Sequence, residues 1–291
     1  FVPGRDTTQP AFILRHLVHA AKQGTKRLWV AFMDFTAAYD CIPRAALWQH
    51  LSAIGMPPFV LSAVKAMYEG DAYILVDGEK RSEPIHATRG VKQGCPLSPL
   101  LFALYINDFA AKMPACEELG VPCLSNPRRK ISHMFYADDL ALLALSAAHL
   151  QRMLDDLVRY AADKGLSVNV GKSVAMPFNT RTLPVTEGRA AIHSLSYGGQ
   201  PLSLVLEFKY VGIVFHSMMS MAATQEFRAR ALAGKAAVVK QMARELGLHR
   251  SIWGRAKLFQ SYALSTALYG SQVWGTRFLA MGQADRKSTR L

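Results

Sequence analysis

Two adjacent carboxylates, Asp138 and Asp139, interrupt an otherwise apolar stretch that runs from Met134 to Leu143. The apolar runs on either side are short and suited to strands, so the simplest structure is a hairpin with a charged turn. Burying both arms would hold the carboxylates at the mouth of the core, where unpaired charge is costly. A divalent cation is the natural counter-charge, because hard oxygen ligands suit Mg²⁺ and a bound metal lets close carboxylates stay ionised. The alternative is a solvated Asp-Asp turn without a chemical role.

Composition excludes several other classes of protein. The chain has 291 residues, of which 51% are hydrophobic, enough for a sizeable core and more than one subdomain. No run reaches about 18 uninterrupted apolar residues, so we expect no membrane span. The four cysteines form no C-x-x-C pair, which indicates neither a zinc knuckle nor a disulfide framework and favours a reducing, intracellular compartment. Residues 1–6 contain neither an initiator Met nor a signal-peptide pattern, so we expect the chain to be part of a longer protein.

The positive charge is concentrated in the second half of the chain. Residues 1–150 carry 15 Lys/Arg and 13 Asp/Glu, whereas residues 151–291 carry 19 and 8, a net charge of +11. Within that half, residues 222–291 contain 12 basic and 3 acidic residues. Such asymmetry favours a surface that follows a phosphate backbone, and the alternatives are a generally basic surface or attraction to anionic membranes.

Hydrophobic periodicity predicts helices and strands in mixed order, hence an α+β fold with an all-helical end. A turn signal at Asp77-Gly78 predicts a hairpin, residues 114–132 are expected to form a loop, and residues 177–200 are irregular. The predicted helices cover residues 7–23, 43–54, 57–68, 100–109, 147–164, 222–246 and 251–268, and the predicted strands cover 28–35, 72–76, 81–88, 134–143 with its turn, 166–170 and 204–215.

A third acid lies at the end of a predicted buried strand. Asp34 follows the apolar run that starts at Leu28, and pairing this strand with the acidic hairpin would bring three carboxylates to one sheet end. Two Mg²⁺ ions about 3.5–4 Å apart, bridged by such carboxylates, activate an attacking hydroxyl and stabilise the leaving oxygen in phosphoryl transfer. That chemistry requires a nucleotide or nucleic acid, for which the basic region supplies a surface.

Five motifs follow one another along the chain. They are Asp34-x4-Tyr39, Gln93-Gly94-Cys95-Pro96-Leu97-Ser98-Pro99, Phe135-Tyr136-Ala137-Asp138-Asp139, Gly165-Leu166-x-x-Asn169-x-x-Lys172 and Phe208-Lys209-Tyr210-Val211-Gly212. In this order they resemble motifs A to E of reverse transcriptases. The similarity is closest to the polymerase of non-LTR retrotransposons, as judged by the long stretch from Gly90 to Phe102 and by Phe1-Val2-Pro3-Gly4-Arg5 followed by Thr7-Thr8. The resemblance implies a right-hand polymerase with an antiparallel palm sheet packed on helices, partial fingers and a helical thumb.

The resemblance implies a metal site and a nucleotide pocket. Asp34 and Asp138 would be the metal ligands and Asp139 the third acid, holding two Mg²⁺ ions, with Mn²⁺ as a possible substitute. Tyr39 would exclude a 2′-hydroxyl beneath the incoming sugar, although a packed strand-end tyrosine would give the same pattern. Gln93 and Gly94 form either a pocket wall or a plain helix-entry turn, and Lys172 either approaches the triphosphate or is a solvated turn lysine. The nucleotide-binding residues implied are Phe35, Tyr39, Gln93, Gly94 and Lys172.

The C-terminal part resembles a primer grip and a thumb. We expect a palm with partial fingers over residues 1–217 and a helical thumb and tail over 218–291. The grip pattern also fits a sheet-edge turn. The residues expected to contact primer or duplex are Phe208, Lys209, Tyr210, Gly212, Arg228, Arg230, Lys235 and Lys240.

The function implied is that of an RNA-directed DNA polymerase using an RNA template, a DNA primer and deoxynucleoside triphosphates. The alternative is an inactive, RNA-binding module of the same fold, as in a maturase or a decayed element. Among active enzymes, the runner-up is the reverse transcriptase of a group II intron. In this family the basic fingers strand would lie before Phe1, and no endonuclease sequence is present. The resemblance also implies an intracellular protein, nuclear if the element is eukaryotic; the oligomeric state stays open.

Overall fold

Five strands form the central sheet of a computed structural model of the chain, which describes residues 6–23, 27–123, 126, 128–179, 195–218 and 220–275. Their spatial order is β13-β10-β1-β9-β8. The apolar run that starts at Leu28 gives β1, which is buried along nearly its whole length and pairs antiparallel with β9, while β9 pairs antiparallel with β8. The bounds are β1 Trp29–Asp34, β8 His133–Tyr136, β9 Asp139–Ala144, β10 Val174–Pro177 and β13 Ser203–Leu204.

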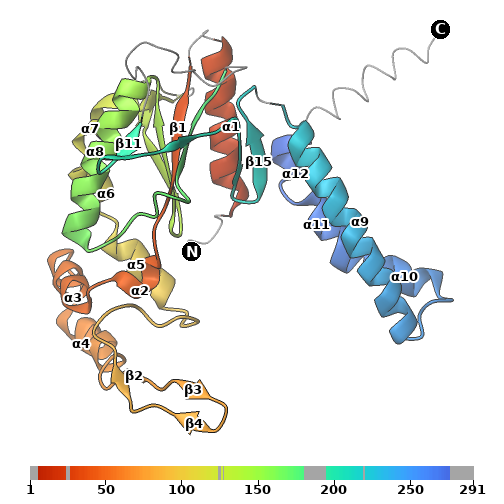
Figure 1. Cartoon of the computed structure of the whole chain (residues 1–291), viewed down its shortest axis with the longest axis horizontal. Coiled ribbons are helices and arrows are strands. Elements are labelled where there is room, and N and C mark those ends of the chain that lie inside the picture. The colour runs from red at the N-terminus through yellow and green to blue at the C-terminus, as the bar shows by residue number, and fades with distance from the viewer. Residues whose placement is uncertain are drawn as a thin grey trace. The chain divides into compact units, whose positions relative to one another are not determined.

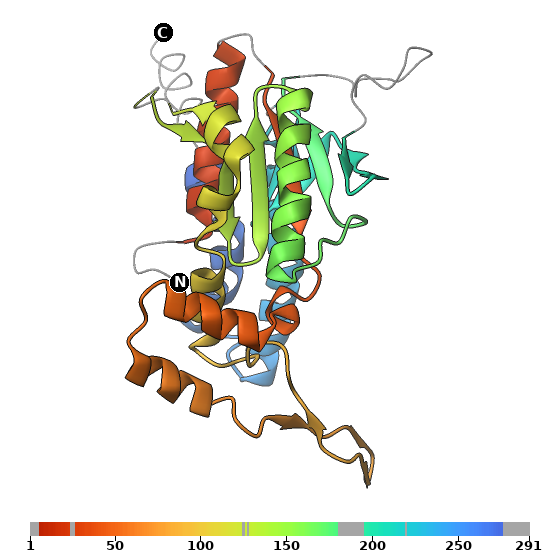
Figure 2. The same ribbon diagram turned by 90° about the vertical axis from the view of Figure 1, so that its left-hand side faces the viewer.

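One long helix, α8 (Ala147–Lys164), covers a face of this sheet (Figures 1 and 2). It begins at Ser146, whose hydroxyl accepts a hydrogen bond from the His149 N–H, and it ends at Gly165 in the left-handed conformation. Leucines spaced at helical intervals are buried against the strands, which confirms the helix predicted over residues 147–164.

Two compact units divide the described chain. The first holds residues 29–175 and 195–203, and the second holds most of 6–28, 176–179 and 204–275. The first unit also contains several short elements around the sheet. They are α2 Ala38–Cys41, α3 Arg44–Ala53, α4 Pro58–Ala66, β2 Ala72–Tyr73, β3 Val76–Asp77, β4 Lys80–Arg81, β5 Ile85–His86, α5 Ser98–Tyr105, α6 Phe109–Lys112, α7 Pro114–Leu119, β6 Val121–Pro122, β7 Lys130–Ile131, β11 Ser196–Tyr197 and β12 Gln200–Pro201.

Two local predictions were wrong. Residues 114–132 are not simply a loop, because Pro114 starts helix α7 and β6 pairs with β7. Residues 166–170 form no strand but only a bridge between Val168 and Phe35, and the strand follows later as β10.

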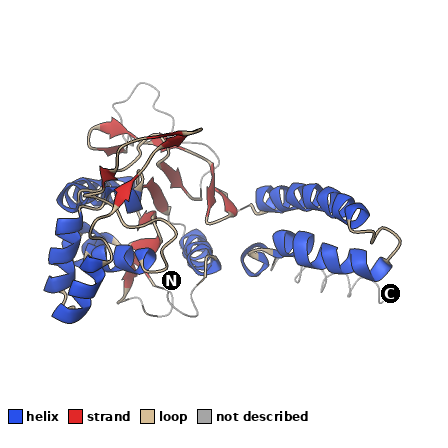
Figure 3. Ribbon diagram, turned by 90° about the horizontal axis from the view of Figure 1, so that it is seen from below, coloured by secondary structure: helices blue, strands red, loops and turns tan. Residues whose placement is uncertain are grey.

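Helices dominate the second unit. Helix α9 runs beside the segment from α10 to α11, which includes one π-helical stretch, η1 (Figure 3). The elements are α1 Thr8–Gln23, β14 Glu207–Tyr210, β15 Ile213–His216, α9 Ala222–Glu245, α10 Ile252–Leu258, η1 Phe259–Leu264, α11 Ser265–Leu268 and α12 Ser271–Trp274. Within the described ranges, no helix combines the length and the apolar character needed to cross a membrane.

Candidate active site

Asp34 is the last residue of β1, and its backbone is held on both sides. Its N–H donates to the Ser173 hydroxyl at 3.0 Å, and its carbonyl accepts from the Asn169 N–H at 2.8 Å. Because the backbone groups are satisfied, the carboxylate is presented at the end of the strand from a fixed position.

The β1–β9 register places Asp34 directly opposite Asp139. Strands β8 and β9 are joined by only two residues, Ala137 and Asp138, with Tyr136 opposite Asp139. Ala137 has a φ of 53°, a left-handed conformation that a side chain disfavours and that a tight hairpin imposes. The fold therefore brings the three predicted acids to one end of the sheet.

The three carboxylates stand out by their lack of ion pairs within the described ranges. Among the described residues, none of Asp34, Asp138 and Asp139 belongs to an ion pair. Packing around its carboxyl raises the pKa of Asp139, and the negative charges of Asp138 and Asp34 raise it further, although the residue as a whole is exposed.

A divalent cation fits this donor chemistry, since three carboxylates supply hard oxygen ligands and two of them raise the pKa of the third. Over the described part of the chain, no three His, Cys, Asp or Glu side chains are already arranged around a metal position. The acids thus share one sheet end without forming a closed cage, and their side chains would have to rotate to share an ion.

Tyr39 lies close enough to the acids to sense their charge. Partial burial raises the pKa of its hydroxyl, and the charge of Asp138 adds to this. Its ring packs on Phe102 of α5 with centroids 4.8 Å apart. Phe35, by contrast, is buried and forms a β-bridge with Val168, so its ring is not available to a nucleotide.

Gln93 and Gly94 lie exposed in the turn that precedes α5, where Gly94 has a φ of +79° and open space around its Cα. Backbone conformation rather than crowding thus favours glycine there. Lys172 is exposed in the turn after Asn169, whose side chain accepts a hydrogen bond from the Lys172 N–H at 3.2 Å.

In the second unit, β14 and β15 form a hairpin whose turn residues, Val211 and Gly212, both have positive φ. Tyr210 is buried and Lys209 is exposed, with its ammonium 4.6 Å from the centroid of the Phe227 ring. Phe208 is partly buried in the same strand.

Arg228 has a different place from the one predicted. Its side chain is 8% exposed, donates to the carbonyls of Gly212 and Thr266, and lies over the Tyr269 ring at 4.6 Å. The guanidinium is therefore used inside the protein, where it ties the hairpin to α9 and α11. Burial removes it from the residues that could meet a nucleic-acid backbone.

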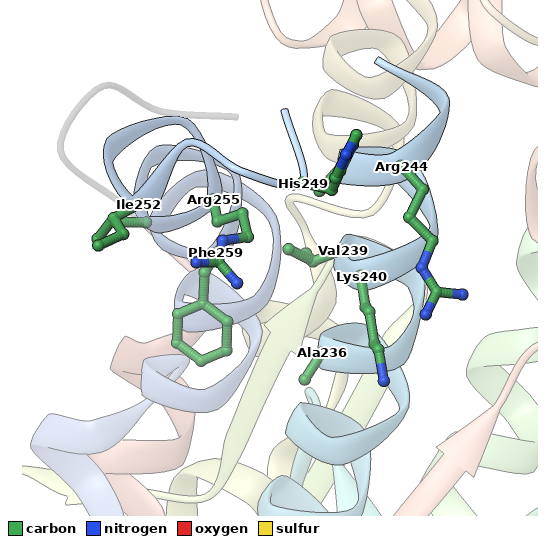
Figure 4. Close-up of a pocket in the computed structure, with 10 residues that line it drawn as sticks. Ala236, Val239, Lys240, Arg244, His249, Ile252, Arg255 and Phe259 are labelled. Carbon is green, nitrogen blue, oxygen red and sulfur yellow. The ribbon is translucent and has the colours of Figure 1, made fainter. Parts of the chain in front are cut away.

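The other basic residues of α9 are more accessible. Arg230 is exposed and pairs with Glu226, and Lys235 lies over the Tyr262 ring at 4.1 Å. Lys240 borders a cavity of about 680 Å³ between α9 and the α10–η1 segment, with Arg244 and Arg255 (Figure 4). This surface combines apolar walls with cations.

Sequence patterns did not assign the supporting residues Ser173, Phe102 and Asp40. Ser173 and Phe102 act through contacts with residues 139 and 63 positions away in the sequence, which no local pattern reports. Asp40 receives two hydrogen bonds from Gln93, and its position one residue after Tyr39 was the available signal.

A family model described as "Reverse transcriptase (RNA-dependent DNA polymerase)" matches residues 1–215. The chain belongs to the reverse transcriptase family. This confirms the resemblance inferred from the five motifs, and the non-LTR type is confirmed by relatives from R2 and jockey elements.

Curated relatives are 24–30% identical to this chain over the aligned residues. A Pol polyprotein of the R2DM element of Drosophila melanogaster is 30% identical over 59% of the chain and 16% of its own length. An R2 polyprotein of Popillia japonica is 26% identical over 70% and 34%. The RNA-directed DNA polymerase of the jockey element of D. melanogaster is 24% identical over 84% and 26%. The chain thus spans between 16% and 34% of the length of these relatives.

Solved structures confirm the right-hand polymerase fold. Telomerase from Candida tropicalis in complex with a fragment of telomeric RNA has a TM-score of 0.50 at 11% identity, covering 95% of this chain and 43% of that one. Its apo form has a TM-score of 0.50 at 13% identity, covering 95% and 46%. At these identities the likeness concerns the fold alone.

Proposed function

We propose that the whole protein is an active RNA-directed DNA polymerase and that Asp34, Asp138 and Asp139 are its catalytic acids. The observation that carries the proposal is the β1–β9 register, which sets Asp34 opposite Asp139, at a sheet end where none of the three acids forms an ion pair with another described residue. Unpaired acids gathered at one sheet end are costly to folding, and cation binding offsets that cost.

The reaction proposed is attack of a primer 3′-hydroxyl on the α-phosphate of a deoxynucleoside triphosphate, with release of pyrophosphate. Asp34 and Asp138, with Asp139 beside them, would hold two Mg²⁺ ions, or Mn²⁺ in their place. Bound there, the ions supply Lewis-acid activation of the hydroxyl and charge stabilisation at the leaving oxygen.

The chain's own residues position the substrates. The Tyr39 ring, braced by Phe102, fills the space a 2′-hydroxyl would need and so favours deoxynucleotides. Gln93 and Gly94 border the nucleotide, and Lys172 supplies a cation to the triphosphate from its exposed turn. Phe35 is buried, so its ring would not contact the nucleotide.

An RNA template and a DNA primer are the proposed partners of the second unit. The β14–β15 turn, with Phe208, Lys209 and Gly212, would place the primer end, while Lys235, Lys240 and Arg230 would follow the duplex backbone. We propose an intracellular site of action, in the nucleus if the element is eukaryotic. The palm of residues 1–217 and the thumb of 218–291 are likewise proposed functional regions.

Primer extension by the full-length protein tests this function. We expect Asp138→Asn and Asp34→Asn each to lower kcat by at least about a hundredfold. A carboxylate that helps to hold a catalytic cation stabilises the charge that develops in the transition state, and this stabilisation amounts to several kcal/mol. Glu79→Gln, an exposed acid in the β3–β4 turn, serves as the control and should extend primers normally. Extension by Asp138→Asn at the wild-type rate would refute the assignment, and a folded wild type that binds template–primer yet never extends it would indicate an inactive RNA-binding module.

A further inference from the structure

Two segments that flank the proposed nucleotide pocket are locked together by their backbones. The Val91 N–H donates to the Tyr39 carbonyl and the Gly90 N–H donates to the Ile42 carbonyl, each at 2.9 Å. At Gly90, whose φ is +81°, an added Cβ would lie 2.9 Å from the Asp40 carbonyl oxygen, so only glycine permits this approach. Asp40 and Gln93 are therefore held side by side.

Asp40 and Gln93 meet through their side chains as well. The Gln93 Nε2 donates to both carboxylate oxygens of Asp40, at 3.0 and 2.9 Å. An ionised carboxylate can only accept hydrogen bonds, and of the two ends of an amide only the nitrogen donates. The pairing therefore fixes which way the amide is turned and leaves its Oε1 directed away from Asp40 as an acceptor.

Two cations near Asp40 are paired with another acid, so they do not compete with Gln93 for the Asp40 carboxylate. Two of the neighbouring cations, Lys92 and Arg44, are both engaged by Asp71, at 2.7 and 3.0 Å. Arg44 is buried and also donates to the Gly90 carbonyl at 2.9 Å, which makes the loop stiff behind Gln93. Asp40 itself pairs with no cation among the described residues.

Both side chains open into a cavity of about 600 Å³, which is large enough to admit part of a nucleotide. Its wall is part polar and part apolar, and it comes from three separate segments of the first unit. The lining residues that matter here are Asp40, Asp71, Tyr73, Arg89, Lys92 and Gln93.

We propose that Asp40 is a positioning residue, which orients the Gln93 amide so that Oε1 accepts a hydrogen bond from the incoming nucleotide. The inference rests on the proposed polymerase function. Asp40 does not touch the reacting atoms, so its loss should weaken nucleotide binding and leave the chemical step nearly intact. Without the carboxylate, the amide can turn either end toward the nucleotide, and the orientation that binds is only partly populated.

A double-mutant cycle on the full-length protein tests this inference, with single-nucleotide extension as the readout. Asp40→Ala should raise the KM for the deoxynucleotide about twofold to tenfold, because the amide orientation that binds is then only partly populated, with kcat changed less than about twofold. Gln93→Ala should raise KM similarly, and the double variant should be no worse than Gln93→Ala alone, because Asp40 acts only through that amide.

Two conservative variants separate orientation from charge. Asp40→Asn can both accept from and donate to the amide, so both amide orientations become possible and KM should rise, by less than in Asp40→Ala. Asp40→Glu keeps an acceptor-only group and should restore most of the affinity. Nucleotide binding to a complex with a dideoxy-terminated primer gives the same comparison without catalysis.

Multiplicative effects of Asp40→Ala and Gln93→Ala would overturn the inference, as would an unchanged KM in Asp40→Ala. A fall in kcat with KM unchanged would also overturn it, since that pattern indicates a role in the chemical step. These outcomes all require a wild type that extends primers. If the wild type itself fails to do so, it is the proposed function that fails.

Discussion

The ring of Tyr39 occupies a defined place because its neighbours leave it little freedom. Tyr39 lies two residues after Ala37, which has a φ of 44°. Its ring packs on that of Phe102 in α5, with centroids 4.8 Å apart. A ring supported in this way cannot move aside for a bulkier sugar without disturbing α5. Selectivity for the sugar is therefore expected to depend on the volume of this side chain.

Tyr39→Ala should admit ribonucleotides. We expect the ratio of kcat/KM for a ribonucleotide to that for the matching deoxynucleotide to rise roughly 10–100-fold, the discrimination that one steric contact provides. Tyr39→Phe keeps the ring and should retain wild-type selectivity. Unchanged selectivity in Tyr39→Ala would show that another group excludes the hydroxyl.

His133, in β8, makes the folded state sensitive to acid. Burial lowers the pKa of its imidazole, and the ring packs 4.8 Å from that of Phe109. The folded state then binds fewer protons than the unfolded state just below the ordinary pKa of about 6.5, so stability falls as the pH falls through that range.

His133→Gln should remove this sensitivity. On going from about pH 7.5 to about pH 5.5, the free energy of unfolding should fall more in the wild type than in the variant, by no more than about 1.4 kcal/mol per pH unit for one proton. Urea denaturation at several pH values measures it. Parallel pH profiles would contradict the effect.

The β14–β15 hairpin carries strain in its turn. Val211 has a φ of 40° and Gly212 a φ of 81°, and a β-branched residue rarely adopts a positive φ. At Gly212 a Cβ would lie 3.0 Å from the ring of Tyr269. The same short turn therefore disfavours a side chain at both positions, for different reasons.

Val211→Asn should relieve this strain and raise the free energy of unfolding by roughly 1 kcal/mol, since Asn tolerates left-handed backbone and suits such turns. Gly212→Ala should lower it by at least about 1 kcal/mol through strain and overpacking. Thermal unfolding of both variants measures the change. A less stable Val211→Asn would show that contacts of the valine methyls outweigh the backbone.

The local sequence pattern predicted several of the main helices and strands. Periodicity and end signals gave α1 and α8 almost to the residue, and the two apolar runs around the acids gave β8 and β9. Arg228 shows where such reasoning stops, because its partners Gly212 and Thr266 lie 16 and 38 residues away. From sequence alone, a basic residue on a helix is expected to be a solvated cation, because the pattern does not show which carbonyls the fold places around it. The nearness of the acids to one another was predicted as a possibility, and only the β1–β9 register made it definite.

Considered as a whole, the chain concentrates its positive charge after residue 150, with a net charge of +11 there. Each phosphate neutralised on binding releases counterions, so affinity for template–primer should fall steeply as salt rises. The exposed Lys240 should contribute to this dependence, whereas the buried Arg228 should not.

Lys240→Ala should reduce the slope of log Kd against log salt by about one. Arg228→Gln should leave the slope unchanged while lowering the melting temperature, because it removes internal hydrogen bonds. Fluorescence anisotropy over a salt series measures both. A slope equal to that of the wild type in Lys240→Ala would remove this residue from the proposed interface.

The two-residue connection between β8 and β9 limits how this domain can change length. Because side chains alternate faces along a strand, one residue inserted after Ala137 would turn every following side chain of β9 to the opposite face and separate Asp139 from Asp34. The β3–β4 hairpin, which is exposed on all sides, imposes no such condition at Gly78. Library construction and domain grafting should therefore use the Gly78 turn as the entry point and leave the length of the acidic hairpin unaltered.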